Sequence, residues 1–152
     1  MTMSRRTFIG TVLAGVMVPS SGGAKAGKVA DNQEPTEMRV RFTFNDLTTM
    51  SAVLYENPSA LDFFSMLPLD LTISNFGPNE KIAYLPRKLT DVGRGVFGNE
   101  QPYDLCYYMP WGNLAMFYAD YKHPGLIRLG RFEEGFEALH VDGEYPLRIE
   151  AM

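Results

Sequence analysis

The chain has 152 residues, with 14 Lys and Arg against 18 Asp and Glu, a single cysteine, and 45% hydrophobic residues. This length allows one domain with its own core, and the composition excludes wholesale disorder. The formal charge of −4 argues against sequence-independent binding to nucleic acid, which needs a basic face. One cysteine cannot form a disulfide within the chain, so a disulfide-built scaffold is excluded as well.

Residues 1–26 have the layout of an export signal. Arg5 and Arg6 precede an uncharged stretch, residues 7–18. Its length fits the apolar region of a secretory signal and falls short of the ~20 residues that span a bilayer. Small residues lead to Ala26, after which we expect cleavage. The sequence therefore predicts a periplasmic or secreted protein with no stable membrane anchor once the signal is removed.

The segment Ser4-Arg5-Arg6-Thr7-Phe8-Ile9 resembles the twin-arginine export signal, although Gly10 stands where a lysine is common. An ordinary secretory signal and a basic start on a cytoplasmic protein are the alternatives. Residues 1–26 hold three basic residues and no acidic one, so their removal changes the formal charge from −4 to −7. This change strengthens the exclusion of nucleic acid and of anionic membrane surfaces as partners.

Residues 27–37 lack hydrophobic periodicity and are predicted to form a flexible tether, which leaves 38–152 as the folded domain. Apolar and polar residues alternate over residues 38–44, which is typical of a strand with one buried face. Turn residues separate further short strand-like segments. We expect these additional strands at residues 50–55, 69–74, 81–86, 104–109, 113–118, 126–132 and 147–150.

One short helix is predicted between Asn57 and Pro68. Asn57 or Ser59 can cap its first backbone N–H groups, and Pro68 ends it. Residues 133–139 could form a single helical turn or an extended link. About eight strands with one helix predict an all-β domain, either a closed barrel or a two-sheet sandwich. We favour the barrel slightly, because closure removes exposed strand edges.

Three blocks, residues 57–69, 79–86 and 107–118, together resemble the bacterial and archaeal cyclophilin-like domain family. A fourth block, residues 125–130, matches the return strand of that family. The resemblance implies a closed eight-stranded cyclophilin-like β-barrel with a helix closing it. The chain departs from the family at Pro102-Tyr103-Asp104, where a glycine usually precedes the aspartate.

The resemblance does not settle an activity. True cyclophilins isomerise X-Pro bonds with an arginine beside an apolar pocket, but this sequence lacks their Phe-His-Arg strand motif. Arg87 is the residue we compare with that arginine, and a solvated basic pair with Lys88 is the alternative. A non-catalytic partner domain of a redox protein is a further alternative. No catalytic residue and no oligomeric state is assigned.

The favoured function is binding of a small molecule or an extended peptide. Trp111 could form an aromatic wall at the barrel mouth with Tyr108 and Phe117, or it could be a packing anchor that closes the barrel end. Asn113 could bond a ligand or supply a turn conformation. Glu80 could be a polar anchor or a solvated strand opener. The predicted ligand-binding residues are thus Glu80, Tyr108, Trp111, Asn113 and Phe117.

The remaining reactive residue types do not form a recognisable site. Cys106 lies between apolar neighbours and is predicted to be buried as a small hydrophobe. His123 and His140 lack the spacing of a metal pair, so we expect no metal. No serine or cysteine nucleophile lies in a recognisable elbow, and no glycine-rich loop opens a helix. We therefore expect no cofactor.

Overall fold

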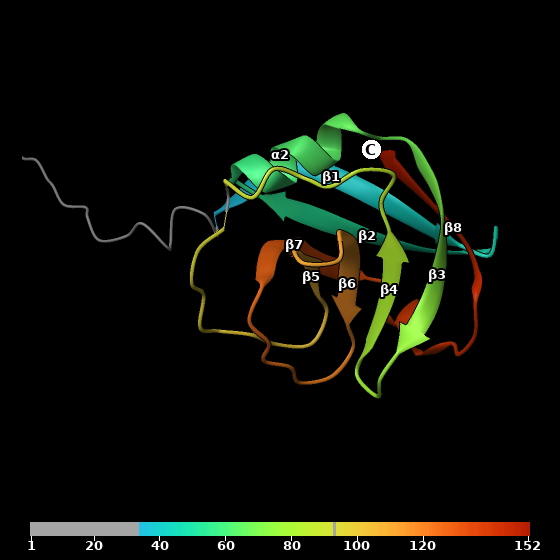
Figure 1. Ribbon diagram of the computed structural model, residues 1–152. Coiled ribbons are helices and arrows are strands. Elements are labelled where there is room, and N and C mark those ends of the chain that lie inside the picture. The colour runs from blue at the N-terminus through green and yellow to red at the C-terminus, as the bar shows by residue number, and fades with distance from the viewer. Residues whose placement is uncertain (1–33, 93) are drawn as a thin grey trace, which may run out of the picture.

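The computed structural model describes residues 34–92 and 94–152, which form a closed barrel of eight antiparallel strands (Figure 1). Around the barrel the strands follow the order β1-β2-β7-β5-β6-β4-β3-β8, and β8 pairs with β1 to close it. The strands are β1 (Pro35–Phe44), β2 (Thr48–Tyr55), β3 (Leu69–Phe76), β4 (Glu80–Tyr84), β5 (Asp104–Tyr108), β6 (Asn113–Phe117), β7 (Leu126–Glu134) and β8 (Tyr145–Ala151).

The prediction of an all-β domain with a closed eight-stranded barrel and one short helix is confirmed. β1 begins at Pro35, three residues before the predicted strand start, so the end of the predicted tether belongs to the barrel. The predicted signal, residues 1–26, lies outside the described residues. The open alternative at 133–139 resolves into a 3-10 helix, η1 (Phe136–His140).

The α-helix, α2 (Pro58–Ser65), lies along the upper edge of the barrel in Figure 1. Asn57 caps it, because its side-chain oxygen accepts a 2.8 Å hydrogen bond from the backbone N–H of Ala60. Ala60 and Phe63 are fully buried and belong to the main core. The helix therefore adds its apolar face to the barrel interior, as its hydrophobic spacing predicts.

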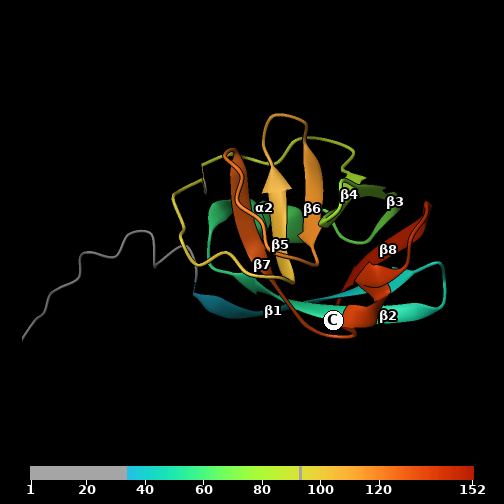
Figure 2. The ribbon, with the colours of Figure 1, turned by 90° about the horizontal axis from the view of Figure 1, so that it is seen from below.

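Three neighbouring strands, β6, β5 and the first half of β7, are buried on both of their faces, and Figure 2 shows them side by side. Leu114 and Met116 of β6 belong to the main core inside the barrel. Because successive side chains of a strand point to opposite faces, the neighbours of these residues lie outside. Those outer residues form a second apolar cluster: Cys106, Ala115, Phe117, Tyr121 and Leu126, with Phe97 and Tyr108 packed against it.

Tyr103 explains how the chain departs from the family pattern before Asp104. Its φ of 74° is left-handed, a backbone conformation that glycine adopts without a steric penalty. The backbone N–H of Tyr103 donates to the carbonyl oxygen of Phe117 at 2.6 Å, and its own carbonyl accepts from Phe132 at 2.9 Å. The Tyr103 ring stacks on Phe136 with 4.0 Å between centroids. The turn is therefore kept, with the stacked ring compensating for the missing glycine.

Candidate functional site: an aromatic pocket on the barrel wall

A pocket lies on the outer face of the barrel wall, where β4, β5 and β6 run side by side. Its cavity volume is about 160 Å³, close to the ~150 Å³ of an apolar cavity that holds one benzene ring. The structure brings together all five residues predicted to bind a ligand. The pocket is lined by Phe76, Glu80, Ile82, Tyr108, Trp111, Asn113, Phe117, His123 and Leu126.

The position of the pocket corrects the predicted barrel mouth. Asn113 and Phe117 have the same parity on β6, opposite to the core residues Leu114 and Met116. Their side chains therefore belong to the outer side of the wall. Trp111 is 50% exposed, so it does not close a barrel end as a buried anchor.

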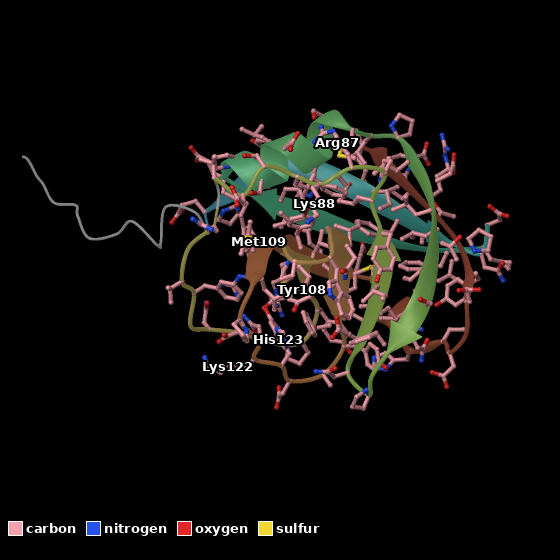
Figure 3. All side chains as sticks on the ribbon, in the orientation of Figure 1. Arg87, Lys88, Tyr108, Met109, Lys122 and His123 are labelled. Carbon is pink, nitrogen blue, oxygen red and sulfur yellow. The ribbon has the colours of Figure 1, made fainter. Side chains whose placement is uncertain are left out.

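Four rings form a continuous rim around the pocket. Phe76 meets Trp111 with 5.6 Å between ring centroids, Trp111 meets Tyr108 at 5.5 Å, and Tyr108 meets His123 at 5.3 Å. All three contacts are edge-to-face, with interplanar angles of 89°, 79° and 82°. Figure 3 shows Tyr108 and His123 close together. Because such contacts are favourable arrangements of aromatic rings, the rim is held in place before any ligand enters.

Two glycines allow this rim to form. Gly112 follows Trp111 in the β5–β6 turn with a φ of 74°, and its N–H donates to the carbonyl of Tyr108 at 2.9 Å. Gly125 has a φ of 85°, and a side chain there would meet the Tyr108 ring at 3.1 Å. The N–H of Met109 donates to the carbonyl of Gly125 at 2.9 Å, which ties the segment carrying His123 to the end of β5. The left-handed backbone at both turns therefore favours glycine.

Asn113 supplies the most informative polar atom. The residue is 2% exposed, and its side-chain nitrogen donates to the carbonyl oxygen of Leu114 at 3.0 Å. Its Oδ1 is the one buried side-chain nitrogen or oxygen of the described residues that has no hydrogen-bond partner. Reversing the amide would set two oxygens against each other, so the unsatisfied atom is an acceptor. Such an atom costs the fold about 1–3 kcal/mol.

Glu80 is half-buried at the start of β4, opposite Phe117 on β6. Burial raises the pKa of its carboxyl from 4.5 to about 7, and the nearby His123 acts in the opposite direction. Desolvation disfavours the charged form of a carboxylic acid, which is the cause of this shift. Glu80 is therefore a carboxyl group whose charge changes near neutral pH.

His123, Phe76, Ile82 and Leu126 also line the pocket and were not predicted. His123 was assessed only as a metal ligand, whereas the turn at Gly125 brings its ring to Tyr108. Glu80 and Ile82 are two residues apart and therefore share one face of β4. Strand alternation could thus have predicted Ile82 as a second lining residue beside Glu80. Phe76 reaches the pocket only because β3 pairs with β4, which sets Phe76 opposite Glu80.

A buried ion network adjoins this wall and was also missed. Asp104 is fully buried and accepts from Arg128 at 3.1 Å, from Arg131 at 2.9 Å and from the Tyr121 hydroxyl at 2.7 Å. Arg128 also donates to the side-chain oxygen of Asn99 at 2.6 Å. The network joins the sheet to the segments on either side of it, so it supports the outer cluster from which the pocket is built.

The other residues considered for chemistry lie elsewhere. Arg87 makes a two-contact ion pair with Asp62 of α2, at 2.8 and 3.0 Å, and none of the described residues that line the pocket is an arginine. Figure 3 places Arg87 well away from Tyr108 and His123. Arg87 and Lys88 are both exposed, which agrees with the alternative of a solvated basic pair, and Arg87 has Asp62 as its ion partner.

Cys106 is buried, as predicted, and burial raises the pKa of its thiol. Within residues 34–92 and 94–152, no group of three or more His, Cys, Asp or Glu side chains could hold a metal ion. The same residues contain no helix long and apolar enough to cross a membrane.

Comparisons with known proteins agree with this architecture. A sequence model described as the cyclophilin-like family matches residues 42–150. Among solved structures, the chain is similar to the solution structure of a hypothetical protein from Archaeoglobus fulgidus, with 18% identity and a TM-score of 0.53. That similarity covers 77% of this chain and 96% of the archaeal one. No curated protein matches the sequence.

Proposed function

The chain belongs to the cyclophilin-like family, and from this premise we propose that it is an exported barrel that binds a small molecule in the aromatic pocket. The unsatisfied Oδ1 of Asn113 carries the proposal. Buried polar atoms in folded proteins nearly always have a partner, and this one belongs to a residue that lines a cavity. A ligand that donates a hydrogen bond would complete it.

The arrangement of the lining supports binding of a small ligand. Aromatic and aliphatic side chains form most of the wall, and a few polar groups converge on it, as in other small-molecule sites. The cavity of about 160 Å³ fits a single ring better than a folded partner. An extended peptide could place only one of its side chains in this cavity. The family similarity supports the fold, whereas the proposed function is argued from the residues of the site.

A second cavity in the same barrel provides an internal control. It has a volume of about 150 Å³ and is lined mainly by apolar residues, among them Phe44, Leu47, Val141 and Tyr145. It is similar in size, but none of its side chains has an unsatisfied buried polar atom. Nonspecific apolar binding should therefore occupy both cavities equally.

The test is a titration of the ¹⁵N-labelled chain with a library of single-ring fragments, followed by NMR. We expect shift changes at the Trp111 indole and the Asn113 side-chain amide, with no matching change at Leu47 or Val141. Equal changes at both cavities, or none at the first, would contradict the proposal. Trp111 is the single tryptophan of the chain, so its fluorescence gives an independent signal.

Export is the second part of the proposal, and it depends on the paired arginines Arg5 and Arg6. Replacing both with lysine should leave the protein in the cytoplasm. The twin-arginine route requires the two arginines, whereas the ordinary secretory route accepts lysine in their place. Cell fractionation measures this outcome. Unchanged export of the variant would exclude the twin-arginine route.

A further inference from the structure

The polar groups of the aromatic pocket lie at its two ends. Glu80 pairs with Phe117, and Asn113 is four residues from Phe117 along β6. At ~3.3 Å per residue, the backbones of Glu80 and Asn113 are about 13 Å apart along the wall. Ile82 lies between them on β4, on the same face as Glu80. A ligand that contacts both polar groups must therefore be elongated, with an apolar middle.

Both ends accept hydrogen bonds. The Asn113 Oδ1 is an acceptor without a donor, since the amide nitrogen of the same side chain is already engaged with Leu114. The Glu80 carboxylate can accept only, once it is ionised. A matching ligand therefore carries a donor at each end, and the donor at Glu80 gains most if it is positively charged.

The rim favours the same kind of ligand. Phe76, Trp111 and Tyr108 surround the cavity as edge-to-face rings. Aromatic walls attract cations through the negative faces of their rings and pack well against a further ring. His123 is the titratable group of the neighbouring segment that acts on Glu80, and β5 contributes Tyr108 and Cys106 nearby. None of these three carries a fixed positive charge that would exclude a cation.

Resting on the small-molecule function above, we propose that the ligand is a single-ring aromatic amine in its protonated form. Its ammonium group pairs with Glu80, its ring lies within the aromatic rim, and a hydroxyl or N–H at its far end donates to Asn113 Oδ1. Tyramine has this form. Its nitrogen and its phenol oxygen lie at opposite ends of the molecule, about 8 Å apart, which is the elongated form with an apolar middle that the spacing of Glu80 and Asn113 along the wall requires.

The test compares tyramine with three matched probes, using calorimetry and Trp111 fluorescence on the full chain. Phenethylamine lacks the phenol hydroxyl, 4-methylphenol lacks the ammonium group, and 4-hydroxyphenylacetate replaces the ammonium arm with a carboxylate. Tyramine should bind tightest. Loss of the ammonium group should weaken binding about 10-fold or more, and loss of the hydroxyl about 3- to 10-fold.

Two variants assign the two ends of the ligand. Glu80→Gln should weaken tyramine and phenethylamine about 10-fold and leave 4-methylphenol unchanged. Asn113→Leu should weaken tyramine and 4-methylphenol and leave phenethylamine unchanged. The second variant keeps the side-chain size, and a thermal melt of each variant verifies that it is folded.

The pH dependence gives an independent readout. Ionisation of Glu80, whose pKa is about 7, should raise the affinity for tyramine about 10-fold between pH 6 and pH 8. This rise in tyramine affinity with pH should vanish in Glu80→Gln and persist in His123→Gln. Persistence in Glu80→Gln would assign the titration to another group and overturn the role of Glu80.

Other outcomes separate this inference from the proposed function. Equal or tighter binding of 4-methylphenol or 4-hydroxyphenylacetate would show that the pocket does not select a cation, and so would overturn the inference while the small-molecule function stands. If none of the four probes binds but other fragments shift Trp111 and Asn113, the inference again fails alone. If no fragment binds the pocket, both fail.

Discussion

Glu80 and Asn113 place polar atoms among aromatic side chains, which opposes folding. The carboxyl group of Glu80 is partly desolvated, and the Oδ1 of Asn113 has no partner. Each polar group would be more stable in water than among apolar side chains. An arrangement that weakens the fold at two positions of one pocket is typical of a site organised for something other than stability.

The pH dependence of stability should report the Glu80 carboxyl directly. Its pKa is raised on folding, so the uncharged form is favoured, and stability falls as the pH rises from 4.5 to about 7. Glu80→Gln cannot ionise. The variant should therefore melt at the same temperature as the wild-type chain, or slightly lower, at pH 4.5, and at a higher temperature at pH 8. Thermal melts across this range measure the difference, and parallel curves for the two proteins would refute the shifted pKa.

At the scale of elements, close approach of backbones shapes the barrel. Gly130 of β7 lies opposite Leu54 of β2, and a Cβ at this glycine would lie 2.2 Å from the carbonyl oxygen of Val53. No side chain fits there without separating the two strands, because both contacting groups are backbone. β7 also carries Leu126 at the pocket and Arg128 in the ion network. A displaced β7 would therefore disturb the whole outer wall.

Gly130→Ala should consequently lower the free energy of unfolding by at least about 2 kcal/mol, as overpacking in a tight core does. Gly98→Ala is the matched control, because nothing lies within 4 Å of a Cβ at Gly98. Urea unfolding compares the two. A Gly130→Ala protein as stable as the control would show that β2 and β7 can separate at little cost.

Across the whole molecule, one buried carboxylate holds distant parts of the chain together. Asp104 of β5 binds two arginines of β7, and Arg128 extends the network to Asn99 in the long segment between β4 and β5. The guanidinium of Arg128 also lies 4.6 Å from the centre of the Phe97 ring. Phe97 of this segment packs against the outer apolar cluster, so the network fixes the segment on the barrel wall.

Asp104→Asn should destabilise the chain by about 3–5 kcal/mol, because it removes the negative charge between two guanidinium groups in a buried site. The matched control is Asp70→Asn, which breaks an exposed pair with Arg148 that is 2.7 Å long. That change should cost under about 1 kcal/mol. Chemical denaturation gives both values. Similar losses in the two variants would mean that burial contributes nothing to the Asp104 network.

The sequence by itself determined an all-β domain with one helix, because local patterns carry these elements, while the closed barrel was only favoured over a two-sheet sandwich and was implied by the family resemblance. Residues 38–44 alternate strictly, since β1 has one face in the core, and the Asn57 cap precedes a short apolar helix. The sequence blocks at residues 57–69, 79–86, 107–118 and 125–130 also indicated the cyclophilin-like family. Residues 104–108 do not alternate, because β5 is buried on both faces, so periodicity identified the strand without indicating which side faced the barrel.

The tertiary structure alone decided where the site lies. Glu80, Trp111 and Asn113 were chosen from the sequence as single residues, but their common pocket depends on the pairing of β4 with β6. His123 joins them because the turn at Gly125 folds back onto β5, and the partners of Asp104 come from 24 and 27 residues along the chain. Contacts of this kind leave no local period in the sequence. They arise only when the barrel closes and sets its outer wall against the covering segments.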